Sequence, residues 1–166
     1  LGFVALADPL RAEVPEAVAL CRRAGIRVVM ITGDHPGTAI TIARQAGIEV
    51  SGGVLSGTEI GSLDDARLTE AVRRASVFAR VPPEQKLRLV QAFRAAGEVV
   101  AMTGDGVNDA PALKAAHIGV AMGMRGTDVA RESAALVLLE DDFGSIVRAV
   151  RLGRRIYENI LIAMRY

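Results

Sequence analysis

Short apolar runs alternate along this chain with longer segments of helical periodicity, and this alternation constrains the fold more than any other feature. The runs are apolar throughout instead of alternating with polar residues, which is typical of strands covered on both faces. They lie at residues 3–7, 27–31, 77–79, 99–102, 118–121 and 136–139. The pattern therefore predicts an α/β fold in which a parallel sheet carries helices on both faces.

Turn and capping residues delimit the helical segments between these runs. Gly25 and Gly47 end two helices, Asp64 is a favourable N-cap for a third, and Pro82-Pro83 begins a fourth. The expected helices cover residues 15–25, 36–46, 64–74, 128–133 and 143 onward, with one that begins at Pro82-Pro83 and carries Leu87, Val90 and Phe93 on one stripe, and another after Asp109. Glycines and serines interrupt residues 48–63, which we expect to form an irregular excursion.

The composition excludes several classes of protein. The 166 residues include 20 Lys and Arg and 19 Asp and Glu, so the net charge of +1 excludes the basic field that non-specific nucleic-acid binding needs. Cys21 is the single cysteine, which excludes an internal disulfide framework and a cysteine-rich zinc site. No apolar run approaches the roughly 18 residues of a membrane-spanning helix.

Two polar loops follow predicted strands at the edge where functional loops of parallel sheets gather. They are Thr32-Gly33-Asp34 and the longer segment 103–109, Thr-Gly-Asp-Gly-Val-Asn-Asp. Glycine lets the backbone approach a ligand closely, and free N–H groups with a hydroxyl suit phosphate oxygens. Asp105 and Asp109 could hold a hard cation such as Mg²⁺. The alternative is that Asp34 and Asp109 only cap the helices that follow.

Lys86 lies between these loops in the sequence, in the first turn of a predicted helix. A lysine there is mildly unfavourable, because the helix dipole is positive at that end. It is either part of a solvated helix face or a fixed cation directed at a phosphoryl group. Its position in the sequence does not decide between them.

The segment 103–113, Thr-Gly-Asp-Gly-Val-Asn-Asp-Ala-Pro-Ala-Leu, resembles the signature of P-type cation-transporting ATPases, within the haloacid dehalogenase-like superfamily. Further segments resemble that family in the expected order along essentially the whole chain. They are Asp8-Pro9-Leu10-Arg11, Thr32-Gly33-Asp34, residues 78–86, 126–130 and 138–143, and the segment 153–160. The last of these resembles the stalk before the fifth membrane helix, and it is most similar to calcium-type pumps.

The resemblance implies a Rossmann-like, haloacid dehalogenase-like fold that acts on ATP and Mg²⁺ through an aspartyl phosphate. By resemblance, Asp105 coordinates Mg²⁺, and Lys86 neutralises charge on the phosphoryl group. The other implied roles fall into three groups: phosphoryl contacts by Thr32, Gly33 and Asn108; support of the loop and the lysine by Asp109; and positions toward the nucleotide and the hinge for Asp34, Arg80, Asp8 and Arg11.

The family's nucleophile lies in an Asp-Lys-Thr-Gly-Thr loop, and no such string occurs in the 166 residues. The resemblance therefore assigns residues 1–142 to the C-terminal part of the phosphorylation domain and residues 143–166 to a stalk helix. The expected partners are the missing parts of the same pump: the nucleophile strand, the nucleotide and actuator domains, and the membrane helices. The transported cation is the expected cargo, and the cytoplasmic face of a membrane is the expected location.

A sheet without its central strand exposes two unpaired edges. We therefore expect these residues alone to pack imperfectly or to self-associate, and to be inactive without the nucleophile. Two other functions remain open: a soluble phosphatase of the same superfamily, and a module that binds phosphate or Mg²⁺ without turnover. The phosphatase would need a nucleophile motif of its own, and nothing in that function explains the basic helix after residue 143.

Overall fold

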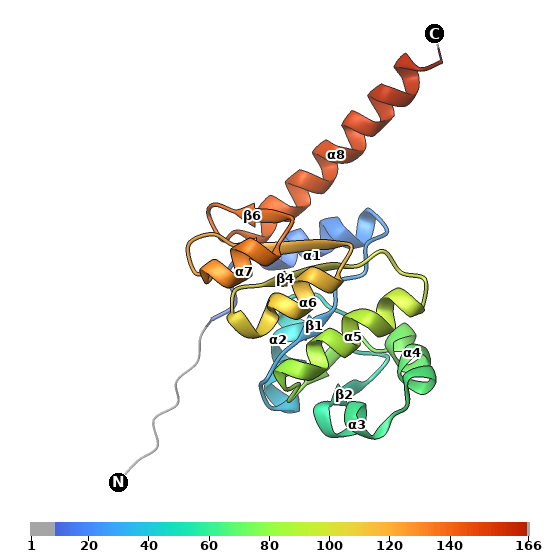
Figure 1. The fold of residues 1–166 in the computed structure, drawn as a ribbon, viewed down its shortest axis with the longest axis vertical. Helices are drawn as coiled ribbons and strands as arrows, with labels where there is room; N and C mark the ends of the chain where they lie inside the picture. Colours follow the sequence, from blue (N-terminus) through green and yellow to red (C-terminus); the bar gives the residue numbers. More distant parts are fainter. Residues whose placement is uncertain (1–8, 166) are drawn as a thin grey trace.

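The computed structural model describes residues 9–165, in which strands and helices alternate as expected (Figure 1). The strands are β1 (Met30–Ile31), β2 (Val54–Ser56), β3 (Val77–Ala79), β4 (Ala101–Gly104), β5 (Ile118–Met122) and β6 (Leu136–Leu138). The helices are α1 (Val14–Arg23), α2 (Pro36–Gln45), α3 (Gly57–Ser62), α4 (Asp65–Arg74), α5 (Pro83–Ala95), α6 (Ala110–Ala115), α7 (Asp128–Ser133) and α8 (Phe143–Ala163), with a 3-10 turn, η1, at Val107–Asp109. The predicted strand at residues 3–7 lies outside the described residues.

The strands form two parallel sheets of three instead of one continuous sheet. Their orders are β1-β3-β2 and β4-β5-β6, so β1 and β4 each have a neighbour on one side only within residues 9–165. Ile31 of β1 and Val100, just before β4, pack against the same core cluster. The edges of β1 and β4, two of the four outer edges of these sheets, therefore border a shared part of the core.

Helices cover both faces of the β1-β3-β2 sheet. On one face, α3, α4 and α5 enclose Phe78 of β3, whose ring meets Phe93 edge-on at a centroid distance of 5.9 Å. On the other face, Val18 of α1 and Ala43 of α2 pack against Val77. In the second sheet, α5, α6 and α7 cover one face.

The opposite face of the second sheet is covered only in part. Val120 of β5 is buried, but Ile118, two residues earlier on the same face, is 41% exposed. Leu136, which lies opposite Val120 in the β5–β6 register, is 49% exposed. The expectation of helices on both faces thus holds for the first sheet and only partly for the second.

Residues 48–63 are more regular than the sequence interpretation allowed, because they contain β2 and α3. A reciprocal capping box begins α3: the Ser56 hydroxyl accepts from the Glu59 N–H, and the Glu59 carboxylate accepts from the Ser56 N–H at 2.7 Å. Bonds from the Ser56 hydroxyl and backbone hold the pKa of Glu59 below its ordinary value. The Ser-x-x-Glu spacing of Ser56 and Glu59 is a sequence signal for the start of a helix, and the sequence interpretation above did not use it.

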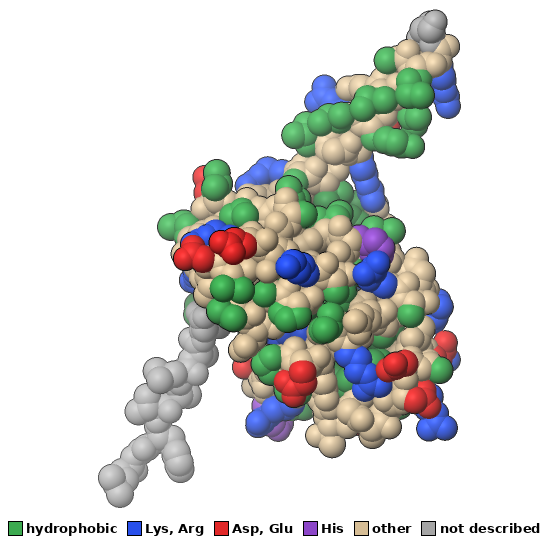
Figure 2. All heavy atoms as spheres, viewed as in Figure 1, with side chains coloured by type: hydrophobic (Ala, Val, Ile, Leu, Met, Phe, Trp, Pro, Cys, Tyr) green, Lys and Arg blue, Asp and Glu red, His purple; other side chains and the backbone are tan. Residues whose placement is uncertain are grey.

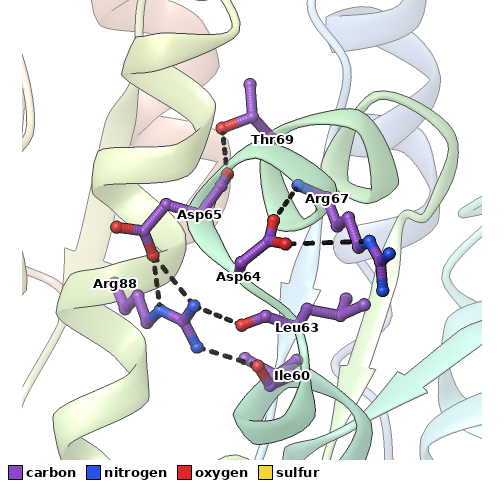
Figure 3. A network of polar contacts seen from close by, with 7 residues as sticks. All are labelled: Ile60, Leu63, Asp64, Asp65, Arg67, Thr69 and Arg88. Carbon is purple, nitrogen blue, oxygen red and sulfur yellow. Dashed lines mark hydrogen bonds and ion pairs between the residues drawn. The ribbon is translucent and has the colours of Figure 1, made fainter.

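Arg88 fixes α5 against the junction of α3 and α4 (Figure 3). Its guanidinium donates to the carbonyl oxygens of Ile60 at 2.8 Å and Leu63 at 2.5 Å, and to the Asp65 carboxylate at 2.9 Å. Lys86 lies two residues earlier on the same helix, so these bonds also set the position of Lys86.

The last helix, α8, projects away from the body of the molecule (Figure 1). Its 21 residues span about 31 Å at 1.5 Å per residue. Asp142 caps it by accepting from the Gly144 N–H at 2.7 Å, and Arg154 donates to the carbonyl of Ala24 just after α1. Among the described residues, no helix combines the length and apolar character that a bilayer crossing requires.

Candidate functional site

The Thr32-Gly33-Asp34 loop directly follows β1 and is bound to the end of β3. The Thr32 N–H donates to the Phe78 carbonyl at 2.9 Å, and the Thr32 carbonyl accepts from the Val81 N–H at 3.1 Å. The Thr32 hydroxyl accepts from the Asp34 N–H at 3.0 Å, which closes the turn. A Cβ built on Gly33 would meet nothing within 4 Å, so there is open space beside this backbone for a ligand.

Arg80 lies next to this loop, with its side chain exposed. Its backbone has φ +52°, and its N–H donates to the Asp34 carbonyl at 3.0 Å. Gly57 makes this approach possible, because a Cβ there would lie 2.1 Å from the Arg80 carbonyl oxygen. The cap of α2 is His35, whose Nδ1 accepts from the Gly37 N–H at 3.1 Å. The alternative that Asp34 caps α2 is therefore wrong.

Lys86 and Asp109 form an ion pair that joins the first turn of α5 to the loop after β4. Lys86 Nζ lies 2.7 Å from Asp109 Oδ1, and the two side chains are only 23% and 8% exposed. The second carboxylate oxygen of Asp109 accepts from the Gly106 N–H at 3.3 Å. The alternative that Lys86 belongs to a solvated helix face is therefore wrong.

Gly104 makes room for the carboxylate in this pair. A Cβ on Gly104 would lie 2.6 Å from the Cβ of Asp109, so another residue here would displace that side chain. Asp109 occupies the N-cap position of α6, but its side chain makes no capping bond to that helix. The capping alternative is thus wrong for Asp109 as well.

Asp105 and Asn108 are exposed at the same end of β4. The Asp105 carbonyl accepts from the Thr127 N–H at 2.8 Å, while within residues 9–165 its carboxylate forms no ion pair. The same region holds no group of three or more His, Cys, Asp or Glu that could enclose a metal. A single free carboxylate fits Mg²⁺, which is commonly bound by one or two carboxylates together with waters and substrate phosphates.

Arg11 binds the loop between β6 and α8, a contact that the resemblance of residues 8–11 to the family's hinge segment did not indicate. Its guanidinium donates to the Asp141 carbonyl at 2.7 Å, between β6 and α8. The Asp141 carboxylate accepts from the N–H groups of Met124 and Arg125. Burial raises the pKa of Asp141, but these N–H groups outweigh burial and hold the pKa below its ordinary value. Asp8 lies outside the described residues.

The profile of the haloacid dehalogenase-like hydrolases matches residues 1–117, more than two thirds of the chain. The chain belongs to this family. Among curated members of similar sequence, the probable cation-transporting ATPase F of Mycobacterium tuberculosis is 56% identical over 164 residues, which cover 96% of this chain and 18% of the relative. The calcium-transporting ATPase of Bacillus subtilis is 50% identical over 167 residues, covering 100% of this chain and 19% of the relative.

A solved structure of a zinc-transporting PIB-type ATPase in its E2.Pi state superimposes with a TM-score of 0.69 at 34% identity. The match covers 92% of this chain and 21% of that structure. These findings confirm the resemblance of this haloacid dehalogenase-like chain to cation-transporting ATPases. The chain spans less than a fifth of the length of the curated relatives described above.

Proposed function

We propose that this chain is the C-terminal part of the phosphorylation domain of an ATP-driven cation pump, residues 1–142, with a stalk helix over residues 143–166. The observation that carries the proposal is the Lys86–Asp109 pair at 2.7 Å, which joins α5, the helix after β3 of the first sheet, to the polar loop after β4 of the second sheet. This pair fixes the lysine beside the loop after β4, and we assign the missing strand to the position between β1 and β4.

The loops supply the contacts for phosphoryl transfer. Thr32, Gly33 and Asn108 contact the phosphoryl oxygens, and Lys86 neutralises their charge, held in place by Asp109. In phosphoryl transfer, positioning and charge neutralisation provide most of the catalysis. Mg²⁺ held by Asp105 would add positive charge at the transferred group. Asp34, Arg80, Asp8 and Arg11 lie toward the nucleotide and the hinge.

The nucleophile is an aspartate on a strand that fits between β1 and β4. A parallel strand there would end at the same edge as both loops, which brings its aspartate beside Lys86 and Asp105. A carboxylate oxygen attacks the γ-phosphorus of ATP, the bond to the leaving oxygen breaks, and ADP departs. Water then attacks the phosphorus of the aspartyl phosphate, which releases inorganic phosphate and restores the carboxylate.

The remaining partners follow from the same assignment. The nucleotide and actuator domains and the membrane helices belong to the longer pump, which places this chain at the cytoplasmic face of a membrane. The Bacillus subtilis relative is named as a calcium transporter, so calcium is the cargo we favour. Without the missing strand the chain is inactive, and its free β1 and β4 edges favour self-association.

The test is acid-stable incorporation of labelled phosphate from γ-labelled ATP. We expect none with this chain alone, and labelling when it forms part of a polypeptide that contains the Asp-Lys-Thr-Gly-Thr loop. In that polypeptide Asp105→Asn should reduce Mg²⁺-dependent labelling by at least about a hundredfold. The matched control is Glu98→Gln, an exposed carboxylate between α5 and β4, which should leave labelling unchanged. Equal labelling of the two variants would refute the metal role of Asp105.

A further inference from the structure

The Asp141 side chain holds the loop after β5, residues 123–127, by accepting hydrogen bonds from its backbone N–H groups. Asp141 is buried, with φ +50°, and its two carboxylate oxygens accept from the backbone of Met124 at 3.0 Å and Arg125 at 2.8 Å. Hydrogen bonds to an ionised acceptor are stronger than those between neutral groups. One side chain therefore fixes two consecutive peptide units of this loop.

The carbonyl groups of the same loop are held by Arg131 of α7. Its guanidinium donates to the Gly123 oxygen at 2.9 Å and also to the Gly126 oxygen. The backbone is folded tightly, because a Cβ on Gly126 would lie 1.8 Å from the Met122 oxygen. With its N–H and carbonyl groups both bound, the loop is held in one conformation.

The fixed loop connects two regions that are far apart in the sequence. At its end, the Thr127 N–H donates to the Asp105 carbonyl at 2.8 Å. The backbone carbonyl of Asp141 accepts a hydrogen bond at 2.7 Å from Arg11, which lies 130 positions earlier in the chain. A continuous series of hydrogen bonds thus runs from Arg11 through Asp141 and residues 124–127 to Asp105.

We propose that Asp141 is a positioning residue that links the Arg11 segment to the Asp105 loop, so that the position of Arg11 influences Mg²⁺ binding at Asp105. The influence on Mg²⁺ rests on the proposed function; the positioning of the loop does not. If Arg11 changes the affinity for Mg²⁺, then Mg²⁺ must stabilise the Arg11 contact to the same extent, because coupling between two sites is reciprocal.

The test compares Asp141→Asn with Asp142→Asn by amide hydrogen exchange of the metal-free chain. Asp142 is a matched control, because its carboxylate bonds only to Gly144, Ser145 and Arg148 of α8 among the described residues. Asparagine at position 141 accepts through one oxygen and presents an NH₂ group to the second N–H. We expect exchange at Thr127 to accelerate by about tenfold or more in Asp141→Asn relative to the amides of β3, and to stay unchanged in Asp142→Asn.

A uniform acceleration that includes β3 would mean that Asp141 only stabilises the fold, and would overturn the proposal. Should Asp141→Asn fail to fold, Arg11→Gln tests the same connection from the exposed end. It should accelerate exchange at Met124, Arg125 and Thr127 with unchanged exchange in β3. Unchanged exchange at those three amides would overturn the link to Arg11.

The Mg²⁺ readout separates this proposal from the assignment of Asp105. Titration with Mg²⁺ alone, followed through the Gly106 amide resonance, should give a weaker affinity in Asp141→Asn than in Asp142→Asn. If Asp105→Asn binds Mg²⁺ as the unmodified chain does, the proposed function fails at this residue, while faster Thr127 exchange would still support the positioning role. If Mg²⁺ binds at Asp105 with equal affinity in the two variants, the influence on the metal is refuted.

Discussion

Replacing Lys86 with methionine should destabilise the chain by about 2 kcal/mol. Removing one partner of a fully buried ion pair costs about 3–5 kcal/mol, whereas exposed pairs contribute about 0.2–1 kcal/mol. The Lys86 and Asp109 side chains are 23% and 8% exposed, which places this pair between the two cases. Asp109 keeps the Gly106 N–H as a donor, so the carboxylate left behind is not wholly without a partner.

Urea denaturation followed by circular dichroism measures this loss. With a slope of about 2 kcal/mol per M, a loss of about 2 kcal/mol moves the midpoint by about 1 M. The control is Arg74→Met, which removes an exposed ion pair with Glu70. The Arg74 and Glu70 side chains are 76% and 59% exposed. That variant should move the midpoint by less than about 0.5 M.

A double-mutant cycle isolates the pair from the other effects of each substitution. Asp109→Asn should also destabilise the chain, and the combined variant should lose less stability than the sum of the two single changes. A coupling of about 1 kcal/mol or more is expected for groups in direct contact. Additive effects, or a midpoint shift for Lys86→Met no larger than that for Arg74→Met, would refute the view that this pair holds α5 against the loop after β4.

Three further changes test the site and α8. In Gly104→Ala the new Cβ would lie 2.6 Å from the Asp109 Cβ, and urea denaturation should show a free energy of unfolding lower by about 1–3 kcal/mol. In Gly153→Ala the new Cβ has no atom within 4 Å, and the higher helix propensity of alanine should raise the thermal stability of α8. The Gly144 N–H lowers the pKa of Asp142 from an ordinary 3.8, so its stabilisation is present above pH 3.8 and is lost as the pH falls through the lower folded value. Asp142→Asn should therefore flatten the decline of the urea midpoint between about pH 5 and pH 3, and parallel pH curves would contradict this.

Local signals in the sequence predicted most of the fold. The Pro82-Pro83 pair marks the start of α5, and the predicted range 77–79 is the observed β3. The strand predicted at 27–31 is shorter, at Met30–Ile31, and these two residues are the ones that pair with Val77 and Phe78 of β3. Strand length depends on pairing with neighbouring strands, and hydrophobic periodicity within one segment carries no information about that pairing.

Contacts between distant residues could not be predicted in the same way. The spacing 103–109 indicated a phosphate and metal loop, but Arg11 and Asp141 are 130 residues apart and no local pattern joins them. Arg88 donates to two carbonyl groups of the α3–α4 junction, a contact that no local pattern around this residue indicates. Such residues act on the backbone of other segments, and the pairing depends on the folded topology.

The acidic residues near the site differ in exposure, and this difference explains which of them a sequence motif can identify as candidate ligands. Asp105 and Asn108 are exposed, with side chains available for a ligand. Asp109 and Asp141 are buried: the Asp109 carboxylate pairs with Lys86, and the Asp141 carboxylate accepts from backbone N–H groups. The space-filling view shows basic and acidic side chains scattered over the visible face of the body and apolar side chains along the projecting α8 (Figure 2). In the proposed function, specificity for a phosphoryl group comes from the fixed loops at the sheet edge, because a net charge of +1 over the whole chain supplies no strong general field to attract one.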